Sequence, residues 1–244
     1  MKNKKFLVIG ILLTAFVFVT CGPSTGTTGQ TDTSERTVEP AAEEGAPPTV
    51  SKVEAGDFGY ILNDDKNGII ITYMTVSATT IVLPDTIEDI PVVDFRRELF
   101  RRNTSLRSIT LPATITAIPA EAFSGCTNLA SVTIPAVNAI GNSAFYGCVS
   151  LVSIDLPAVT TIGVSAFNDC SNLTKVTLAE GLTSIGGYAF ADCRNLTEIN
   201  VPASLTQFPR APYESNDNTF FNCQKLPLTT RNKLTSQGYS GRGF

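Results

Sequence analysis

The hydrophobic positions of this chain repeat with a period of 22 or 23 residues, with one longer last interval. A phenylalanine marks each copy, a cysteine follows it three residues later in five copies, and a leucine comes three residues after that. The phenylalanines are Phe100, Phe123, Phe145, Phe167, Phe190 and Phe220. One such unit cannot bury its apolar face without neighbours, so the period predicts a stacked solenoid.

Each unit contains a short apolar alternation that is usually closed by proline, as in Ile154-Asp155-Leu156-Pro157. A period of two is typical of a strand, with the middle residue pointing away from the core. A second extended piece follows, for example Val159-Thr160-Thr161-Ile162, and Gly163 then releases the backbone into the next turn. We expect Ser165-Ala166-Phe167 to form one helical turn.

The two ends of the array depart from the repeat and predict caps. Two β-prone runs, residues 58–62 and 69–73, flank a turn that ends in Asn67-Gly68, which predicts a β-hairpin. Residues 78–84 then read as a degenerate first coil. Residues 226–234 are expected to form a closing helix. Atypical end units are expected because a bare terminal coil would expose its core.

The first 53 residues differ in composition from the array. Residues 1–20 contain three lysines followed by an apolar run, as in a secretory signal peptide. Residues 18–22, Phe-Val-Thr-Cys-Gly, resemble a bacterial lipobox, which implies that Cys21 is lipidated; the alternative is an ordinary secreted protein with a chance cysteine. Residues 21–53 are rich in Ser, Thr, Gly, Pro and Glu and predict a disordered tether. The predicted solenoid with its caps covers residues 54–244.

The repeat resembles a known family. The spacing Cys-x-x-Leu-x-x-Ile-x-Leu-Pro, continued to Ile-Gly-x-x-Ala-Phe, is similar to the BspA-like leucine-rich repeat of bacterial surface proteins and is clearest over 126–145, 148–167 and 170–190. The resemblance implies a right-handed leucine-rich-repeat coil of short parallel strands and short helical turns. It also implies an exported, often lipid-anchored protein that binds host or bacterial proteins, most often in adhesion.

The composition offers little for catalysis. The chain has no histidine, which excludes Ser-His-Asp and Cys-His machinery, and no glycine-rich phosphate loop or recurring carboxylate pair is present. We therefore expect a non-enzyme without cofactor or metal. The repeat cysteines, Cys126, Cys148, Cys170, Cys193 and Cys223, are interpreted as buried free thiols, with disulfides or a metal site as the alternatives. Removal of residues 1–20 changes the formal charge from −4 to −7, which argues against nucleic-acid binding.

Two surfaces are candidates for binding a protein. The first, called here the strand face, is formed by outward positions of the predicted strands: Thr110, Thr133, Asp155, Lys175, Thr177, Glu198 and Asn200. Strand preference explains the threonines equally well, but it does not explain the charged residues and Asn200. The second, the basic edge, comprises Arg96, Arg97, Arg101, Arg102 and Arg107, which could bind acidic partners or only keep the first coil soluble. The insertion at 210–219 is a possible binding loop or a tolerated addition.

Two functions fit these features. The chain is predicted to be an exported lipoprotein, at the outer membrane or cell surface, that binds a host extracellular or bacterial envelope protein. In the alternative, it faces the periplasm as a structural or assembly lipoprotein that binds other envelope proteins. In both, the lipid anchor is the only membrane contact.

Overall fold

The structure is a computed structural model that describes residues 55–75, 77–208, 218–241 and 244. The predicted signal peptide, Cys21 and the tether lie outside the described residues. So does most of the 210–219 insertion.

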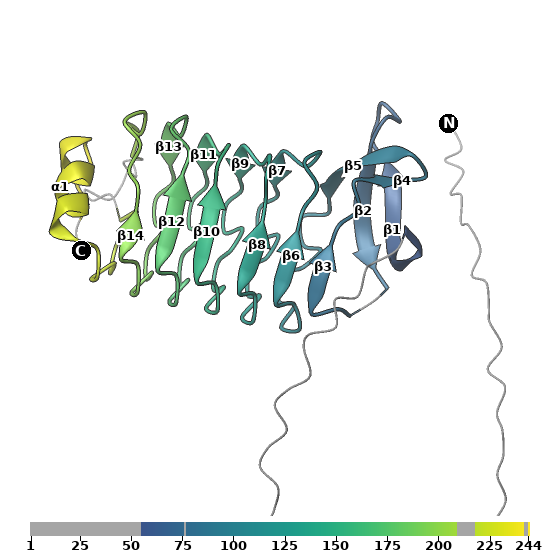
Figure 1. Cartoon of the computed structure of the whole chain (residues 1–244), viewed down its shortest axis with the longest axis horizontal. Coiled ribbons are helices and arrows are strands. Elements are labelled where there is room, and N and C mark those ends of the chain that lie inside the picture. Colours follow the sequence, from purple (N-terminus) through teal and green to yellow (C-terminus); the bar gives the residue numbers. More distant parts are fainter. Residues whose placement is uncertain (1–54, 76, 209–217, 242–243) are drawn as a thin grey trace, which may run out of the picture. The chain divides into compact units, whose positions relative to one another are not determined.

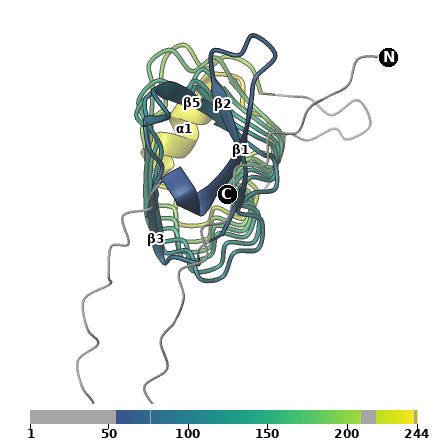
Figure 2. The same cartoon turned by 90° about the vertical axis from the view of Figure 1, so that its right-hand side faces the viewer.

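Two rows of short parallel strands run along the stack of coils (Figure 1). The first row pairs in the orders β3-β6-β8 and β10-β12-β14, and the second in the order β7-β9-β11-β13. The first row consists of β3 (Thr80–Val82), β6 (Ser108–Thr110), β8 (Ser131–Thr133), β10 (Ser153–Leu156), β12 (Lys175–Leu178) and β14 (Glu198–Ile199). The second consists of β7 (Ala117–Ile118), β9 (Ala139–Ile140), β11 (Thr161–Ile162) and β13 (Ser184–Ile185). Viewed along the stack, successive coils superimpose (Figure 2).

The strand register follows the repeat register. Ile109 pairs with Val132 and Ile154 pairs with Val176, so equivalent residues of neighbouring coils lie side by side. These apolar residues are buried, as the alternation predicts, because every second side chain of a strand points to the same face. The predicted leucine-rich-repeat solenoid is therefore confirmed.

A ladder of phenylalanine rings forms the centre of the core. The six repeat phenylalanines stack with centroids 5.1–5.5 Å apart and ring planes within 9° of parallel. An aromatic ring of different orientation ends the ladder on each side: Phe95 meets Phe100 at 63°, and Tyr239 meets Phe220 at 82°. Stacked and edge-to-face rings at these distances are favourable arrangements, so the ladder is closed at both ends by aromatic contact.

The segment that positions each phenylalanine consists of hydrogen-bonded turns, and the prediction of a helical turn there was wrong. Ser143 and Ser165 have left-handed backbones, with φ of 54° and 55°, which interrupt a helix. The N–H of Phe145 instead donates to the carbonyl of Ala166 in the next coil, at 2.8 Å. Stacking between coils thus satisfies backbone groups that a helix would have satisfied internally.

The glycines of the repeat allow close approach between coils. A Cβ built on Gly163 would lie 2.6 Å from the backbone nitrogen of Asn142, and one on Gly186 would lie 2.4 Å from that of Val164. Neither glycine has a positive φ. Glycine is therefore required at these positions because a side chain would clash with the preceding coil. The turn conformation that we expected at Gly163 is not the reason.

The N-terminal end is a mixed sheet of four strands in the order β1-β2-β5-β4. The 3₁₀ helix η1 (Ala55–Asp57) precedes β1 (Phe58–Leu62), which pairs antiparallel with β2 (Ile69–Met74) and confirms the expected hairpin. A second hairpin, β4 (Thr86–Ile87) and β5 (Ile90–Phe95), accounts for the extra length of the first coil. The sequence does not signal this hairpin, because its turn is Glu88-Asp89, both at positive φ, where Asn-Gly is the usual signal.

The C-terminal end carries helix α1 (Leu228–Ser236), close to the predicted closing helix. Leu234 of the helix is fully buried, and Tyr239 behind it contacts the rings of Phe220 and Phe208. Within the described residues, no helix has the length and apolar character needed to cross a membrane.

Candidate functional site

The strand face is the outward side of the first strand row. Along it, Ser108 and Thr110 of β6 pair with Ser131 and Thr133 of β8. In the same way Lys175 of β12 lies between Ser153 of β10 and Glu198 of β14. At the usual spacing of neighbouring strands the row from β3 to β14 is about 24 Å long. Short strands with buried apolar residues therefore hold small polar and charged groups at regular intervals along one surface.

Most of the predicted strand-face residues are exposed, and the charged ones gather at one end. Thr110 and Thr177 are half-buried, whereas the other five are exposed: Thr133, Asp155, Lys175, Glu198 and Asn200. The Nζ of Lys175 lies 2.6 Å from a carboxylate oxygen of Glu198. The hydrogen bond from Lys175 to Glu198, and to a smaller extent the nearby charge of Asp155, raises the pKa of Lys175. The structure thus brings all three charged residues together.

Asn200 has a structural role that its sequence position does not reveal. It follows β14, and its side-chain oxygen accepts from the N–H of Leu178 at 2.6 Å while its amide nitrogen donates to the carbonyl of Leu178 at 2.8 Å. The side chain of Asn200 takes the place of the backbone hydrogen bonds that a longer β14 would have formed with β12. These hydrogen bonds to the neighbouring strand explain why an asparagine stands at this position. The expectation that strand structure leaves Asn200 unexplained was therefore wrong.

The basic edge lies on the first coil, where the N-terminal sheet meets the array, and all five arginines are exposed. Two of them form ion pairs: Arg97 with Glu121 at 2.7 Å, and Arg101 with Glu121 at 3.3 Å and Glu98 at 3.7 Å. The hydrogen bond from Arg97 and the charge of Arg101 lower the pKa of Glu121. Glu121 comes from the next coil and was missed, although the repeat register places it beside Glu98, since each precedes its phenylalanine by two residues.

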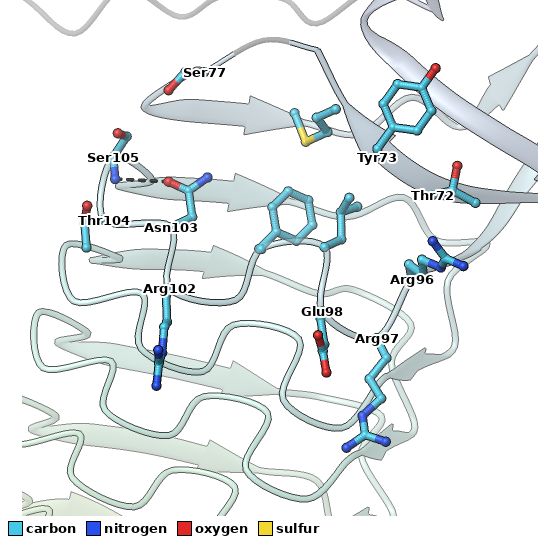
Figure 3. Close-up of a pocket in the computed structure, with 13 residues that line it drawn as sticks. Thr72, Tyr73, Ser77, Arg96, Arg97, Glu98, Arg102, Asn103, Thr104 and Ser105 are labelled. Atoms are coloured by element: carbon cyan, nitrogen blue, oxygen red, sulfur yellow. Dashed lines mark hydrogen bonds between the residues drawn. The ribbon is translucent and has the colours of Figure 1, made fainter.

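A groove of about 800 Å³ opens beside the basic edge, between the end of β2 and the first coil. It is lined by residues 72–74, 77, 96–100 and 102–105. Figure 3 shows Arg96 and Arg97 at one end, Asn103, Thr104 and Ser105 at the other, and Tyr73 on the side of β2. A smaller hollow of about 300 Å³ adjoins it through Arg102, which lines both. The groove is not predictable from the sequence, because Tyr73 and Met74 belong to a different element from the arginines.

The repeat cysteines are all fully buried and free. Each sulfur lies within hydrogen-bonding distance of the carbonyl oxygen of the phenylalanine one coil earlier, which makes each thiol a donor between coils. Burial raises the pKa of Cys126 to about 11 and that of Cys223 to about 12, and it raises the pKa of the three central thiols well above the usual range. Neutral, inaccessible thiols are poor nucleophiles and poor metal ligands.

The described residues contain no group of three or more Cys, Asp or Glu side chains placed to hold a metal ion. Glu98 is the only carboxylic acid in the lining of the groove, and it faces arginines and hydroxyl groups. The two surfaces carry groups that are suited to binding, through hydrogen bonds, ion pairs and apolar contact.

Comparison with known proteins agrees with this architecture. A sequence model of the BspA-type leucine-rich repeat region matches residues 93–227 in six copies. A leucine-rich repeat protein of Treponema pallidum is similar over 79% of this chain and 98% of its own, with 29% identity and a TM-score of 0.61. A leucine-rich cell surface protein of Faecalibacterium prausnitzii is similar over 76% of this chain, with 29% identity and a TM-score of 0.62. This chain spans 55% of the latter protein's length. A search of curated proteins gave no match.

Proposed function

Because the chain belongs to the BspA-type leucine-rich repeat family, we propose that it is a lipid-anchored protein of the cell envelope that binds a protein partner through its strand face. Solenoids of this fold are typically non-catalytic scaffolds that present extended surfaces to other proteins. The solved relative from Faecalibacterium is described as a cell surface protein, which supports an exported location. Adhesion is the form of binding that we propose.

The observation that carries the proposal is the charged end of the strand face. Asp155, Lys175 and Glu198 lie on neighbouring strands, exposed, above apolar residues that are buried. The ion pair between Lys175 and Glu198 is exposed, and exposed pairs contribute little to folding stability. Stability therefore does not account for these charges, whereas recognition of a complementary polar partner surface does.

The anchor in this proposal is Cys21. Diacylation would attach the chain to a membrane, since two acyl chains anchor a protein stably where one does not. Replacement of Cys21 by alanine should move the protein from the detergent phase to the aqueous phase in a Triton X-114 partition. Equal partition of the two forms would show that the chain is not lipidated.

Protease treatment of intact cells tests the side of the envelope on which the solenoid is displayed. Loss of the protein, with a periplasmic marker left intact, is expected for display at the surface. Protection of the solenoid until the outer membrane is permeabilised would overturn surface display and favour the periplasmic assembly role.

A further inference from the structure

The groove beside the basic edge is bounded on one side by the open end of a strand. β2 pairs with β5 only as far as Ile71 and Phe95, and the N–H of Arg96 then donates to the carbonyl of Ile71 at 2.7 Å. β5 ends there, whereas β2 continues to Met74. Among the described residues, no strand or bridge pairs with residues 72–74 on this side. The last three residues of β2 therefore form a free sheet edge that lines the groove.

The backbone of Met74 points to this free edge. The N–H of Thr75 donates to the carbonyl of Asp57 at 2.9 Å, so these two residues form a hydrogen-bonded pair. Bonded and non-bonded pairs alternate along an antiparallel ladder, which makes Met74 and Phe58 a pair without hydrogen bonds between them. The N–H and C=O of Met74 consequently point away from β1, toward the side on which β5 has ended.

The rest of the lining carries positive charge. In Figure 3 the end of β2 lies across the groove from the turn that carries Glu98 and Arg102. Arg97 is held by Glu121, but Arg96 and Arg102 are exposed and form no ion pair with any residue that the structure describes. Glu98 is the single acidic residue of the lining. The groove is thus locally positive in a chain whose formal charge is −4.

Backbone contacts fix the positions of the two arginines that have no ion pair. Arg96 is tied to β2 by its bond to Ile71. Arg102 has a left-handed backbone, with φ of 57°, and its N–H donates to the carbonyl of Ser124 at 2.8 Å. A Cβ built on Gly125 would lie 3.1 Å from the Cγ of Arg102, so the stem of this side chain lies against the next coil. The guanidinium groups, which bind carboxylates through paired hydrogen bonds, therefore start from fixed points.

The apolar part of the lining lies between these groups. Met74 and Leu99 are half-buried, and Tyr73 is 59% exposed. An extended peptide would use all three features, because its main chain pairs with a free strand edge while its alternate side chains contact charged and apolar groups. A sulfated glycan would match the arginines, but it has no ladder of backbone N–H and C=O groups to pair with β2. The lining therefore favours a peptide.

We propose that the groove binds an extended acidic peptide of a partner protein, which adds a strand to the free end of β2. The backbone of Met74 exchanges hydrogen bonds with the peptide. Arg96 and Arg102 bind carboxylates, which lie about 6.6–6.8 Å apart on alternate residues of an extended chain and share one face of it. Apolar side chains between them pack against Met74 and Leu99. This site has no residue in common with the strand face.

Titration with synthetic peptides tests the proposal on the isotope-labelled full chain with Cys21→Ser. The probe is acetyl-Glu-Val-Glu-Val-Glu-amide, and we expect it to shift the amide signals of residues 72–75 and 96–105 and to slow hydrogen exchange of the Met74 N–H. The neutral peptide acetyl-Gln-Val-Gln-Val-Gln-amide should bind at least about tenfold more weakly, because it cannot form charge-assisted hydrogen bonds with the arginines. Equal affinity of the two peptides, or no shift at millimolar probe, would overturn the proposal.

Backbone methylation of the probe tests the added strand. Successive N–H groups of an extended chain point to opposite edges, so only one set of alternate residues can pair with β2. Of two probes, one methylated on the nitrogens of its valines and the other on those of its glutamates, one should bind at least about tenfold more weakly than the parent and the other should bind nearly as well. Equal affinity of the two methylated probes would overturn pairing with β2.

Variants of the groove give the reciprocal test. Arg96→Gln with Arg102→Gln should weaken the acidic probe at least about tenfold and leave the neutral peptide unchanged. Arg107→Gln with Lys233→Gln removes the same charge outside the groove and should preserve the affinity. Shifts confined to residues 153–156 and 175–178 would overturn the assignment, because they would place the peptide on the strand face. Shifts of residues 96–105 with a heparin hexasaccharide but with none of the peptides would overturn it in favour of a glycan site.

Discussion

The sulfur of Cys126 lies 2.9 Å from the carbonyl oxygen of Phe100, one coil earlier. The same contact recurs in the next four coils, so each cysteine satisfies a carbonyl that stacking would otherwise leave with a single partner. The first coil has no earlier repeat phenylalanine, and there Asn103 replaces the cysteine. Its side-chain oxygen accepts from the N–H groups of Ser105 and Leu106, at 3.0 and 3.1 Å.

Restoring the consensus residue in the first coil should therefore weaken the protein. Asn103→Cys removes the acceptor for two backbone N–H groups and offers a thiol with no phenylalanine carbonyl to bind. We expect a loss of about 1–2 kcal/mol in the free energy of unfolding, the usual effect of removing such a local acceptor. Urea unfolding of the two forms measures it. An equal or higher stability of Asn103→Cys would contradict this account of the cysteine positions.

The buried thiols predict a steep loss of stability at alkaline pH. A cysteine in the unfolded chain has a pKa near ~8.5, whereas the folded values are about 11 for Cys126 and about 12 for Cys223. A raised folded pKa means that stabilisation is complete below the unfolded pKa and is lost as the pH rises toward the folded one. Above pH ~9, each thiol therefore lowers the free energy of unfolding by about 1.4 kcal/mol for every further pH unit.

Unfolding in urea at a series of pH values under reducing conditions checks this slope. Cys126→Ala should reduce the slope by the share of one thiol, because one proton fewer is released on unfolding. A free energy of unfolding that stays constant from pH ~9 to ~10.5 would show that these thiols ionise in the folded state.

The phenylalanine ladder should dominate stability at its centre. Phe167 is fully buried between Phe145 and Phe190, and Phe167→Ala should cost about 3–5 kcal/mol, because it leaves a cavity that the stack cannot close. Phe221 is 43% exposed, and Phe221→Ala is a matched control expected to change stability by less than about 0.5 kcal/mol. Thermal or urea unfolding distinguishes them. Similar losses of stability for the two variants would mean that the phenylalanine ladder does not make a special contribution to the stability of the core.

The stacked array could be predicted because every copy of the repeat has the same spacing of buried residues. Six phenylalanines in register specify the stacking, and the strand alternation specifies which side is buried, so residues such as Ile154 and Asp155 were placed correctly. The turn segment could not be predicted from local sequence, because the left-handed Ser143 is stabilised by bonds to the next coil. Local propensity contains no information about such contacts.

The candidate surfaces were only partly predictable, for the same reason. The exposed charges at Asp155, Lys175 and Glu198 follow from period two alone. The bonds of Asn200 to Leu178 and the bridge from Glu121 to Arg97 join different coils, and they become visible only when the coils are stacked. The groove also requires Met74 of the N-terminal sheet to meet the first coil, and no repeat specifies that contact.

Photo-crosslinking on intact cells tests the central claim, that the strand face binds a protein partner. A benzophenone amino acid is placed at Asp155 on the strand face, at the exposed Thr161 on the second strand row, and at Arg102 in the groove. We predict a discrete covalent adduct with one other protein from position 155, its loss when Lys175 and Glu198 are also changed to alanine, and none from position 161. An adduct from position 102 or 161 without one from 155 would contradict the claim, and so would the absence of adducts from all three.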